Sequence, residues 1–268
     1  QAGAVPILAV DDAGRTYGHA GAVYLQGCSG QRRIPFLQIC DIMVDPAVRG
    51  HLGDKNLYTR MIRRFFDRLA SDFPDAFAYG FPGTRPFKLG KYAGFYECIE
   101  QAHEITLATR RPAPWLLVRP APLVDPNLDR LWSLFKGHLS LSLDRNRDYL
   151  AWRYQDNPNC EYRRVDLFHW RRHAGWVVFR PLAAKTLIVD LLCQPQHFPL
   201  YLSAVAHWLE SRGEPPAVVW LPGRLGTKVS GTSTETDVVT TNVVRGFRTP
   251  TSEAWDKLYY TTGDMDIF

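Results

Sequence analysis

One local pattern occurs twice in this chain of 268 residues and restricts the folds that it can adopt. In each copy a short apolar strand ends in a polar residue and a proline, a helical stretch follows, and a second strand closes with Pro-Gly. The copies cover residues 42–83 and 189–223. Strand–helix–strand units are common, but the matched ends favour duplication over chance. The repeat therefore predicts an α/β protein of two similar halves, each with a central mixed sheet flanked by helices.

The two copies differ most in the connection between strand and helix. Pro46 and Gly83 are 37 positions apart, whereas Pro195 and Gly223 are 28 positions apart. The difference of nine is about the length of residues 48–56. We therefore expect a loop in the first half that the second half lacks.

This longer loop has the composition of an anion site. Gly50 and Gly53 allow tight turns with N–H groups pointing inward, and Arg49 and Lys55 add positive charge. The helix that follows adds the positive potential of its N-terminus. Taken alone, a Gly-x-x-Gly segment is also compatible with an ordinary strand–helix connection.

Charge, hydropathy and cysteine content exclude several classes of protein. The 32 basic side chains exceed the 27 acidic ones by five, a mild excess that suits an anionic coenzyme and lacks the dense basic stripe of a nucleic-acid-binding protein. No apolar run approaches the roughly 18–20 residues of a membrane span. Five cysteines without a CxxC pair favour a reducing, cytoplasmic location.

Periodicity and turn residues predict the other elements. Apolar residues at helical spacing predict a helix over residues 57–69, with arginines on the opposite face. Residues 223–235 are rich in Gly, Ser and Thr and predict a flexible loop. Residues 257–261 predict a final strand.

The segment DIMVDPAVRG (residues 41–50) resembles the acetyl-coenzyme A binding motif of the GNAT-type N-acyltransferases. In that family a hydrophobic strand ends in an acidic-Pro segment, followed by an Arg-Gly loop and a helix. The usual loop reads Gln/Arg-x-x-Gly-x-Gly/Ala, and only Arg49 matches it. Leu52 and Asp54 stand where small residues are expected, and Gly53 is displaced by one position. The resemblance implies that acetyl-CoA or another acyl-CoA is bound by nine residues: Met43, Val44, Arg49, Gly50, His51, Leu52, Gly53, Asp54 and Lys55.

The second half is similar to the second repeat of tandem GNAT proteins, beginning with DYLAWRY at residues 148–154. We expect one half over residues 1–122 and a degenerate half over residues 123–268. The junction QPQHFP at residues 194–199 has no glycine and no arginine. The second half is therefore expected to serve as a scaffold or acceptor wall. Because the family places a strand and helices before its first antiparallel strands, we also expect such elements to precede Gln1.

The resemblance implies direct acyl transfer, which needs a base for the acceptor and a proton for the leaving thiolate. Asp41, on the strand that enters the loop, is the candidate base, and a solvent-facing strand residue is the alternative interpretation. The family often places a tyrosine acid four residues before the glycine of its Gly-Phe ending, which here is Gly90. Tyr92 and Tyr96 are the candidate substitutes, with aromatic core packing as the alternative for either.

The resemblance thus implies an acyltransferase of class EC 2.3.1 that acts on an amine or hydroxyl of a small molecule, sugar or peptide. Trp152, Tyr154 and Trp176 are candidates for the lining of an acceptor groove, and core packing explains them equally well. We expect no metal, because His169 and His173 are four residues apart but strand and turn signals, rather than a helix, surround them. Two alternatives remain: a non-catalytic GNAT-like binding module, and a relative of the Fem-type aminoacyl transferases.

Overall fold

The structure is a computed structural model that describes residues 3–50 and 56–265. The chain forms two compact units. Unit 1 comprises Gln1–Cys28, Arg32–Gln101 and Asp237–Trp255, and unit 2 comprises Ser29–Gln31, Ala102–Thr236 and Asp256–Phe268. These units differ from the expected division at residue 122, because residues 237–255 return to the first unit.

Unit 1 is a mixed sheet with its two longer helices packed against it. Its strands are β1 (Gly3–Val10), β2 (Thr16–Ser29), β3 (Arg32–Val44) and β4 (Phe77–Gly80), with parts of β5 (Tyr96–Leu107) and β12 (Gly231–Val243). Its helical segments are η1 (Pro46–Val48), α1 (Leu57–Asp72), α2 (Thr84–Tyr92) and α7 (Thr251–Ala254). The strand order is β1-β2-β3-β4-β12-β5, with β3 and β4 parallel and β12 antiparallel to β4.

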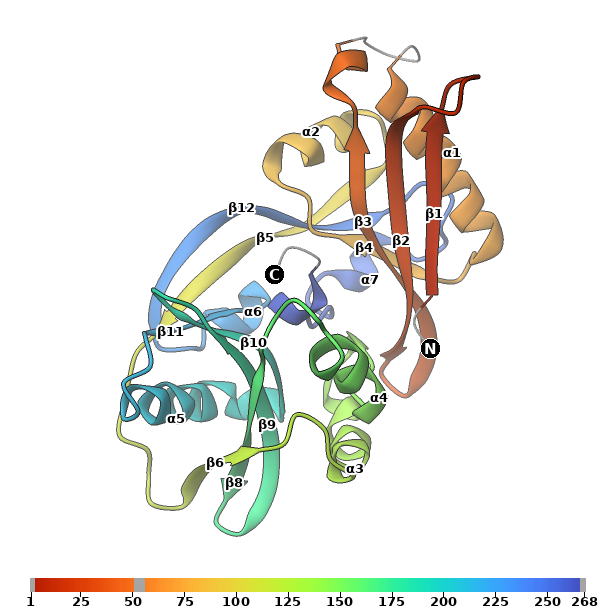
Figure 1. The fold of residues 1–268 in the computed structure, drawn as a ribbon. Coiled ribbons are helices and arrows are strands. Elements are labelled where there is room, and N and C mark those ends of the chain that lie inside the picture. The colour runs from red at the N-terminus through yellow and green to blue at the C-terminus, as the bar shows by residue number, and fades with distance from the viewer. Residues whose placement is uncertain (1–2, 51–55, 266–268) are drawn as a thin grey trace. The chain divides into compact units, whose positions relative to one another are not determined.

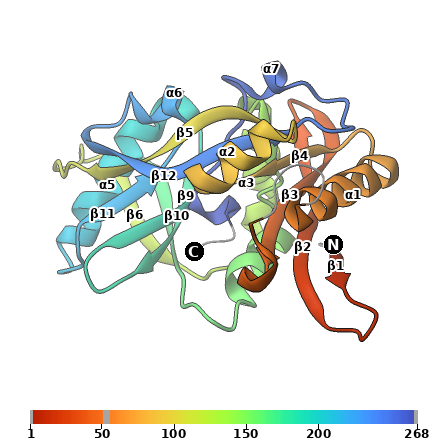
Figure 2. The same ribbon diagram turned by 90° about the horizontal axis from the view of Figure 1, so that it is seen from above.

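The predicted helix over residues 57–69 is confirmed as α1, which packs along the sheet of unit 1 (Figure 2). Asn56 caps the helix, its Oδ1 accepting a hydrogen bond from the Thr59 N–H at 3.2 Å. The apolar face supplies five residues to the core of the unit: Met61, Ile62, Phe65, Phe66 and Leu69. Burial of this face, rather than helix propensity alone, holds the helix in place.

Unit 2 contains the longer series of elements. Its strands are β6 (Leu116–Ala121), β7 (Leu141–Leu143), β8 (Arg163–His169), β9 (Arg172–Pro181), β10 (Thr186–Cys193) and β11 (Ala217–Trp220). Its helical segments are α3 (Asn127–Phe135), η3 (Lys136–His138), α4 (Arg147–Leu150), η4 (Ala151–Gln155), η5 (Pro195–His197), α5 (Phe198–Glu210), α6 (Gly223–Gly226) and η6 (Thr262–Asp264). The strand order is β12-β5-β11-β10-β9-β8-β6. Figures 1 and 2 both place α5 beside β11.

The predicted repeat has a structural counterpart in each unit. The first repeat consists of β3, η1, α1, β4, α2 and β5, and the second consists of β10, η5, α5, β11, α6 and β12 in the same order. The two strands that flank the first long helix are parallel in both units. In unit 1, β12 lies between β4 and β5, and in unit 2, β5 lies between β11 and β12. Each repeat therefore receives one strand from the other.

Two predicted elements near the C-terminus are wrong. Residues 223–235 form α6 and the start of β12 instead of a loop. The Gly, Ser and Thr content of this segment is typical of a loop, but pairing with β5 orders its last part as a strand. Residues 257–261 form no named strand. Leu258 makes an isolated bridge to Leu141, and the side chain of Tyr259 bonds the Leu191 carbonyl. The consecutive apolar residues 258–260 are all buried, so they reflect the packing of an irregular segment.

In the part of the chain that the structure describes, no helix combines the length and hydropathy that a bilayer crossing requires.

Candidate functional site

The first feature of the candidate site is the end of β3, where the strand continues past its partner. The parallel ladder between β3 and β4 runs from Phe36 and Phe77 to Ile39 and Gly80. Beyond that pair, β3 continues for five residues to Val44, while the chain after β4 turns into α2. The strands thus separate at the end that leads into the predicted anion loop.

Asp41 lies at this separation and has an unusual backbone. Its φ of 51° places it in the left-handed region, which Asp tolerates better than most residues. The ring Nδ1 of His19 lies 2.7 Å from the Asp41 carbonyl oxygen. The Asp41 side chain is exposed, and Met43, two residues on, is 64% exposed. The predicted base therefore lies in solvent at the start of the separated strand end.

The junction after β3 is ordered by hydrogen bonds of its own. Asp45 accepts from the Ala47 N–H at 2.8 Å and donates its own N–H to the Tyr17 carbonyl. The Nε of Arg49 donates to the Val44 carbonyl at 2.8 Å, so the guanidinium folds back over the end of β3. Gly50 has a φ of 109°, which explains the need for glycine there.

The structure thus brings four predicted coenzyme-binding residues to one place: Met43, Val44, Arg49 and Gly50. The other five lie outside the described residues: His51, Leu52, Gly53, Asp54 and Lys55. The helix that follows begins at Leu57, and its first-turn N–H groups carry partial positive charge. An exposed arginine at the end of β3 and the N-terminus of a 16-residue helix are both groups that suit a phosphate.

The two candidate acids have opposite surroundings. Tyr92 ends α2 with 90% of its surface exposed. Tyr96 is buried, and its ring lies where a side chain on Gly90 would be: a Cβ there would stand 2.1 Å from Tyr96 ring carbons. The Tyr96 ring therefore fills the side-chain space of the position at which the family often carries its tyrosine.

Tyr96 is linked to a residue that sequence reasoning missed. Burial raises the pKa of Tyr96 well above its usual value, and the neighbouring Tyr58 and a hydrogen bond to it raise that pKa further. Burial also raises the pKa of Tyr58, while the same bond lowers it, as expected if Tyr96 donates and Tyr58 accepts. Tyr58 lies in the first turn of α1, where its spacing indicated only a helix residue.

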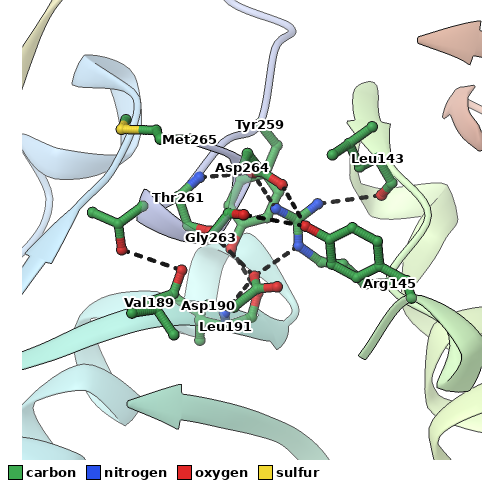
Figure 3. Close-up of polar contacts among 12 residues, drawn as sticks. Leu143, Arg145, Val189, Asp190, Leu191, Tyr259, Thr261, Gly263, Asp264 and Met265 are labelled. Atoms are coloured by element: carbon green, nitrogen blue, oxygen red, sulfur yellow. Dashed lines mark hydrogen bonds and ion pairs between the residues drawn. The ribbon is translucent and has the colours of Figure 1, made fainter. Parts of the chain in front are cut away.

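The equivalent strand end of unit 2 is closed. The β10–β11 ladder ends at Ile188 and Val219, and Asp190 precedes Pro195 by five residues, as Asp41 precedes Pro46. Asp190 is fully buried and accepts a hydrogen bond from the Arg145 Nε at 2.8 Å (Figure 3).

The C-terminal segment of unit 2, residues 259–265, covers this strand end. Thr262 donates to the carbonyls of Ile188 and Val189. Asp264 pairs with the second arm of the Arg145 guanidinium (Figure 3). Gly263 is so close to the Tyr154 hydroxyl that a Cβ would stand 2.0 Å from it. Two aromatic candidates for an acceptor groove, Tyr154 and Trp176, are buried in unit 2, whereas Trp152 is 39% exposed.

In the described residues no group of three or more His, Cys, Asp or Glu side chains is arranged to hold a metal ion.

Comparisons with known proteins identify the fold. No protein-family model matches the sequence, and no curated protein matches it. A GCN5-related N-acetyltransferase from Anabaena variabilis is similar in structure, with a TM-score of 0.66 and 14% identity, over 94% of this chain and 64% of that one. A GCN5-related N-acetyltransferase from Kribbella flavida has a TM-score of 0.60 and 15% identity, over 85% and 56%.

A tandem GNAT protein from the clavulanic acid biosynthesis pathway has a TM-score of 0.59 and 8% identity, over 93% of this chain and 85% of that one. The predicted fold class and the predicted resemblance are thus confirmed: the chain has the fold of tandem GNAT proteins, and its structural neighbours are GNAT N-acetyltransferases. The chain spans 64% of the length of the Anabaena enzyme and 56% of that of the Kribbella enzyme.

Proposed function

We propose that this chain is an acyl-CoA-dependent acyltransferase that moves an acetyl or other acyl group directly to an amine or hydroxyl of an acceptor. The observation that carries the proposal is the contrast between the two repeats. The end of β3 presents Asp41 and Met43 to solvent, whereas the equivalent end of β10 is covered by residues 259–265. We therefore assign acyl-CoA to unit 1 alone.

The residues at the end of β3 suit an acyl-CoA. The Nε of Arg49 donates to the Val44 carbonyl, and the two terminal nitrogens of the guanidinium are the proposed donors to a phosphate. Gly50 and the N-terminus of α1 would contribute backbone N–H groups, together with the predicted residues 51–55. Met43 offers an exposed apolar surface to the thioester-bearing arm of the coenzyme.

In this mechanism the acceptor amine attacks the thioester carbonyl, forming a C–N bond and then breaking the C–S bond. Asp41 is the proposed base that takes the amine proton as the bond forms. Backbone N–H groups of the strand end past Ile39 are the proposed donors to the developing oxyanion. A thioester supplies the activated acyl group, so the chain itself needs no covalent intermediate.

Tyr96 is the proposed proton donor to the leaving thiolate, in preference to Tyr92. Its ring occupies the side-chain space of position 90, and a tyrosine phenol, which is protonated at neutral pH even at its ordinary pKa, carries the proton that the thiolate needs. The hydrogen bond to Tyr58 fixes its orientation.

A thermal-shift titration with acetyl-CoA and longer acyl-CoAs tests the proposed function. We expect a rise in Tm that Arg49→Glu removes and Arg33→Glu, an exposed change on the same strand, preserves. No shift with any acyl-CoA would indicate the non-catalytic alternative. Stabilisation by an aminoacyl-tRNA instead would indicate the Fem-type alternative.

A further inference from the structure

Two tryptophans stack on each other at the surface of unit 2, at the edge of its sheet. Trp115 precedes the edge strand β6, and Trp170 lies in the turn between β8 and β9. Their ring centroids are 6.1 Å apart, and the Trp170 N–H donates to the Trp115 carbonyl at 2.6 Å. The two side chains are 41% and 66% exposed, although tryptophan is usually well buried.

The backbone of Trp170 makes its exposure harder to explain by folding alone. Its φ of 57° lies in the left-handed region, which favours glycine in a hairpin turn. A bulky aromatic residue there destabilises the fold and buries little surface in return. Strain kept at an exposed position points to a role outside the folded core.

The chain segments that carry the two tryptophans are strongly basic. Segments 108–119 and 167–175 contain five arginines and no carboxylate, and the formal net charge of the whole chain is +5. All five are exposed: Arg110, Arg111, Arg119, Arg171 and Arg172. The nearest carboxylate in sequence, Asp166, is largely buried and lies 3.2 Å from Arg164. The positive charge of these segments is thus largely uncompensated by carboxylates of their own.

We propose that this basic–aromatic surface (Trp115, Trp170, Arg171 and Arg172) docks the protein on an anionic lipid bilayer. Tryptophan rings are favoured at the level of the lipid headgroups, and arginines beside them are attracted to anionic lipids. Trp170 and Arg171 form the tight turn that closes the β8–β9 hairpin, and this hairpin end projects from the sheet of unit 2 (Figure 1). A projecting turn suits insertion between headgroups, whereas single-stranded nucleic acid is usually bound along a groove.

Co-sedimentation of the full chain with vesicles tests this proposal. We expect binding to phosphatidylcholine vesicles that contain about 30 mol% phosphatidylserine, little binding to phosphatidylcholine alone, and loss of binding at high salt. The double change Arg171→Glu and Arg172→Glu should weaken binding about tenfold or more. The matched control is Arg32→Glu with Arg33→Glu, an adjacent exposed pair at the start of β3, which should bind like the unchanged protein.

Trp170→Gly separates docking from folding. Glycine suits the left-handed φ, so Tm should rise by about 2–4 °C while vesicle binding falls, with acetyl-CoA binding unchanged. Equal binding to both kinds of vesicle, no binding to either, or equal loss in the Arg32 and Arg33 control would overturn the proposal. So would binding of a labelled single-stranded RNA that depends on Trp170 and Arg171 when vesicles do not bind.

Discussion

Asp41 and Asp190 occupy equivalent positions in the two repeats, yet their surroundings are opposite. Asp41 is exposed at a left-handed turn of the strand, whereas Asp190 is buried against Arg145 and Tyr154. A buried carboxylate that is already paired has no access to an acceptor amine. Of these two equivalent aspartates, only Asp41 is therefore open to the proposed role of base, whereas Asp190 belongs to a buried polar cluster.

Asp41→Asn tests the proposed base. Asparagine tolerates the left-handed backbone, so the fold and the affinity for acetyl-CoA should be preserved. We expect kcat to fall by roughly 100-fold or more, because the acceptor amine loses its proton acceptor. The measurement is steady-state acyl transfer with an identified acceptor, alongside calorimetric titration of acetyl-CoA. Unchanged kcat would assign Asp41 to the solvent-facing alternative.

Gly90→Ala tests the fit between α2 and Tyr96. The added methyl would lie 2.1 Å from the Tyr96 ring, so we expect a loss of about 1–3 kcal/mol in unfolding free energy. Gly94→Ala is the contrasting change: its Cβ meets open space, and its cost would come from its positive φ alone. Denaturant unfolding measures both. If Gly90→Ala costs as much in a Tyr96→Ala background as in the unchanged protein, the clash with the Tyr96 ring is not the cause.

Among the site residues, the sequence predicts those that a motif marks. Arg49 and Gly50 could be identified from the Arg-Gly pattern, and the structure places them at the end of β3. Tyr58 could not be found, because its hydrogen bond to Tyr96 joins positions 38 apart through the fold. Trp170 could not be recognised as strained, since its left-handed φ is a property of the hairpin turn.

At the scale of elements, the C-terminal segment 259–265 is held in unit 2 by buried polar contacts. Arg145 pairs with both Asp190 and Asp264, and its guanidinium lies 4.6 Å from the centroid of the Tyr259 ring. Arg153 donates to the carbonyls of Gly263 and Met265. Removing one partner of such a cluster leaves a buried charge unpaired, which typically costs about 3–5 kcal/mol.

Asp264→Asn tests how the free energy of unfolding depends on pH through this segment. Burial raises the pKa of the Asp264 carboxyl above its usual value, although Arg145 opposes the rise. Because the folded-state pKa is the higher one, the stabilisation from this group is present below the unfolded pKa and is lost as pH rises through the folded pKa. The stability of the unchanged protein relative to Asp264→Asn should therefore fall as pH rises from the unfolded value near 3.8 through the raised one. Urea unfolding across that range measures it, and a relative rise would show that pairing with Arg145 dominates.

Elements whose apolar spacing lies within their own residues could be predicted from the sequence. Elements that depend on pairing with a distant strand could not. The apolar spacing of α1 is complete within its own residues. In contrast, β12 begins in a segment of Gly, Ser and Thr, and its order comes from β5, more than 120 residues earlier in the chain. The irregular segment after Trp255 has three consecutive apolar residues, 258–260, which are buried, and Tyr259 bonds the Leu191 carbonyl of β10.

At the scale of the whole molecule, β5 and β12 each contribute to both units. Neither unit retains its full sheet if one of these strands is lost, so the two units should unfold together. We expect one urea transition with coincident probes in each unit. Val243→Asp, a buried change in the unit 1 part of β12, should lower the midpoint for unit 2 probes as well, whereas Val10→Asp at an exposed site should not. Two separated transitions would contradict this coupling.

The central claim is that one repeat binds acyl-CoA and the other is closed by its own chain. Isothermal titration of the full chain with acetyl-CoA tests it most directly. The account predicts one site per chain, abolished by Arg49→Glu and retained by Arg33→Glu. Two sites per chain, or a single site that survives Arg49→Glu, would contradict it.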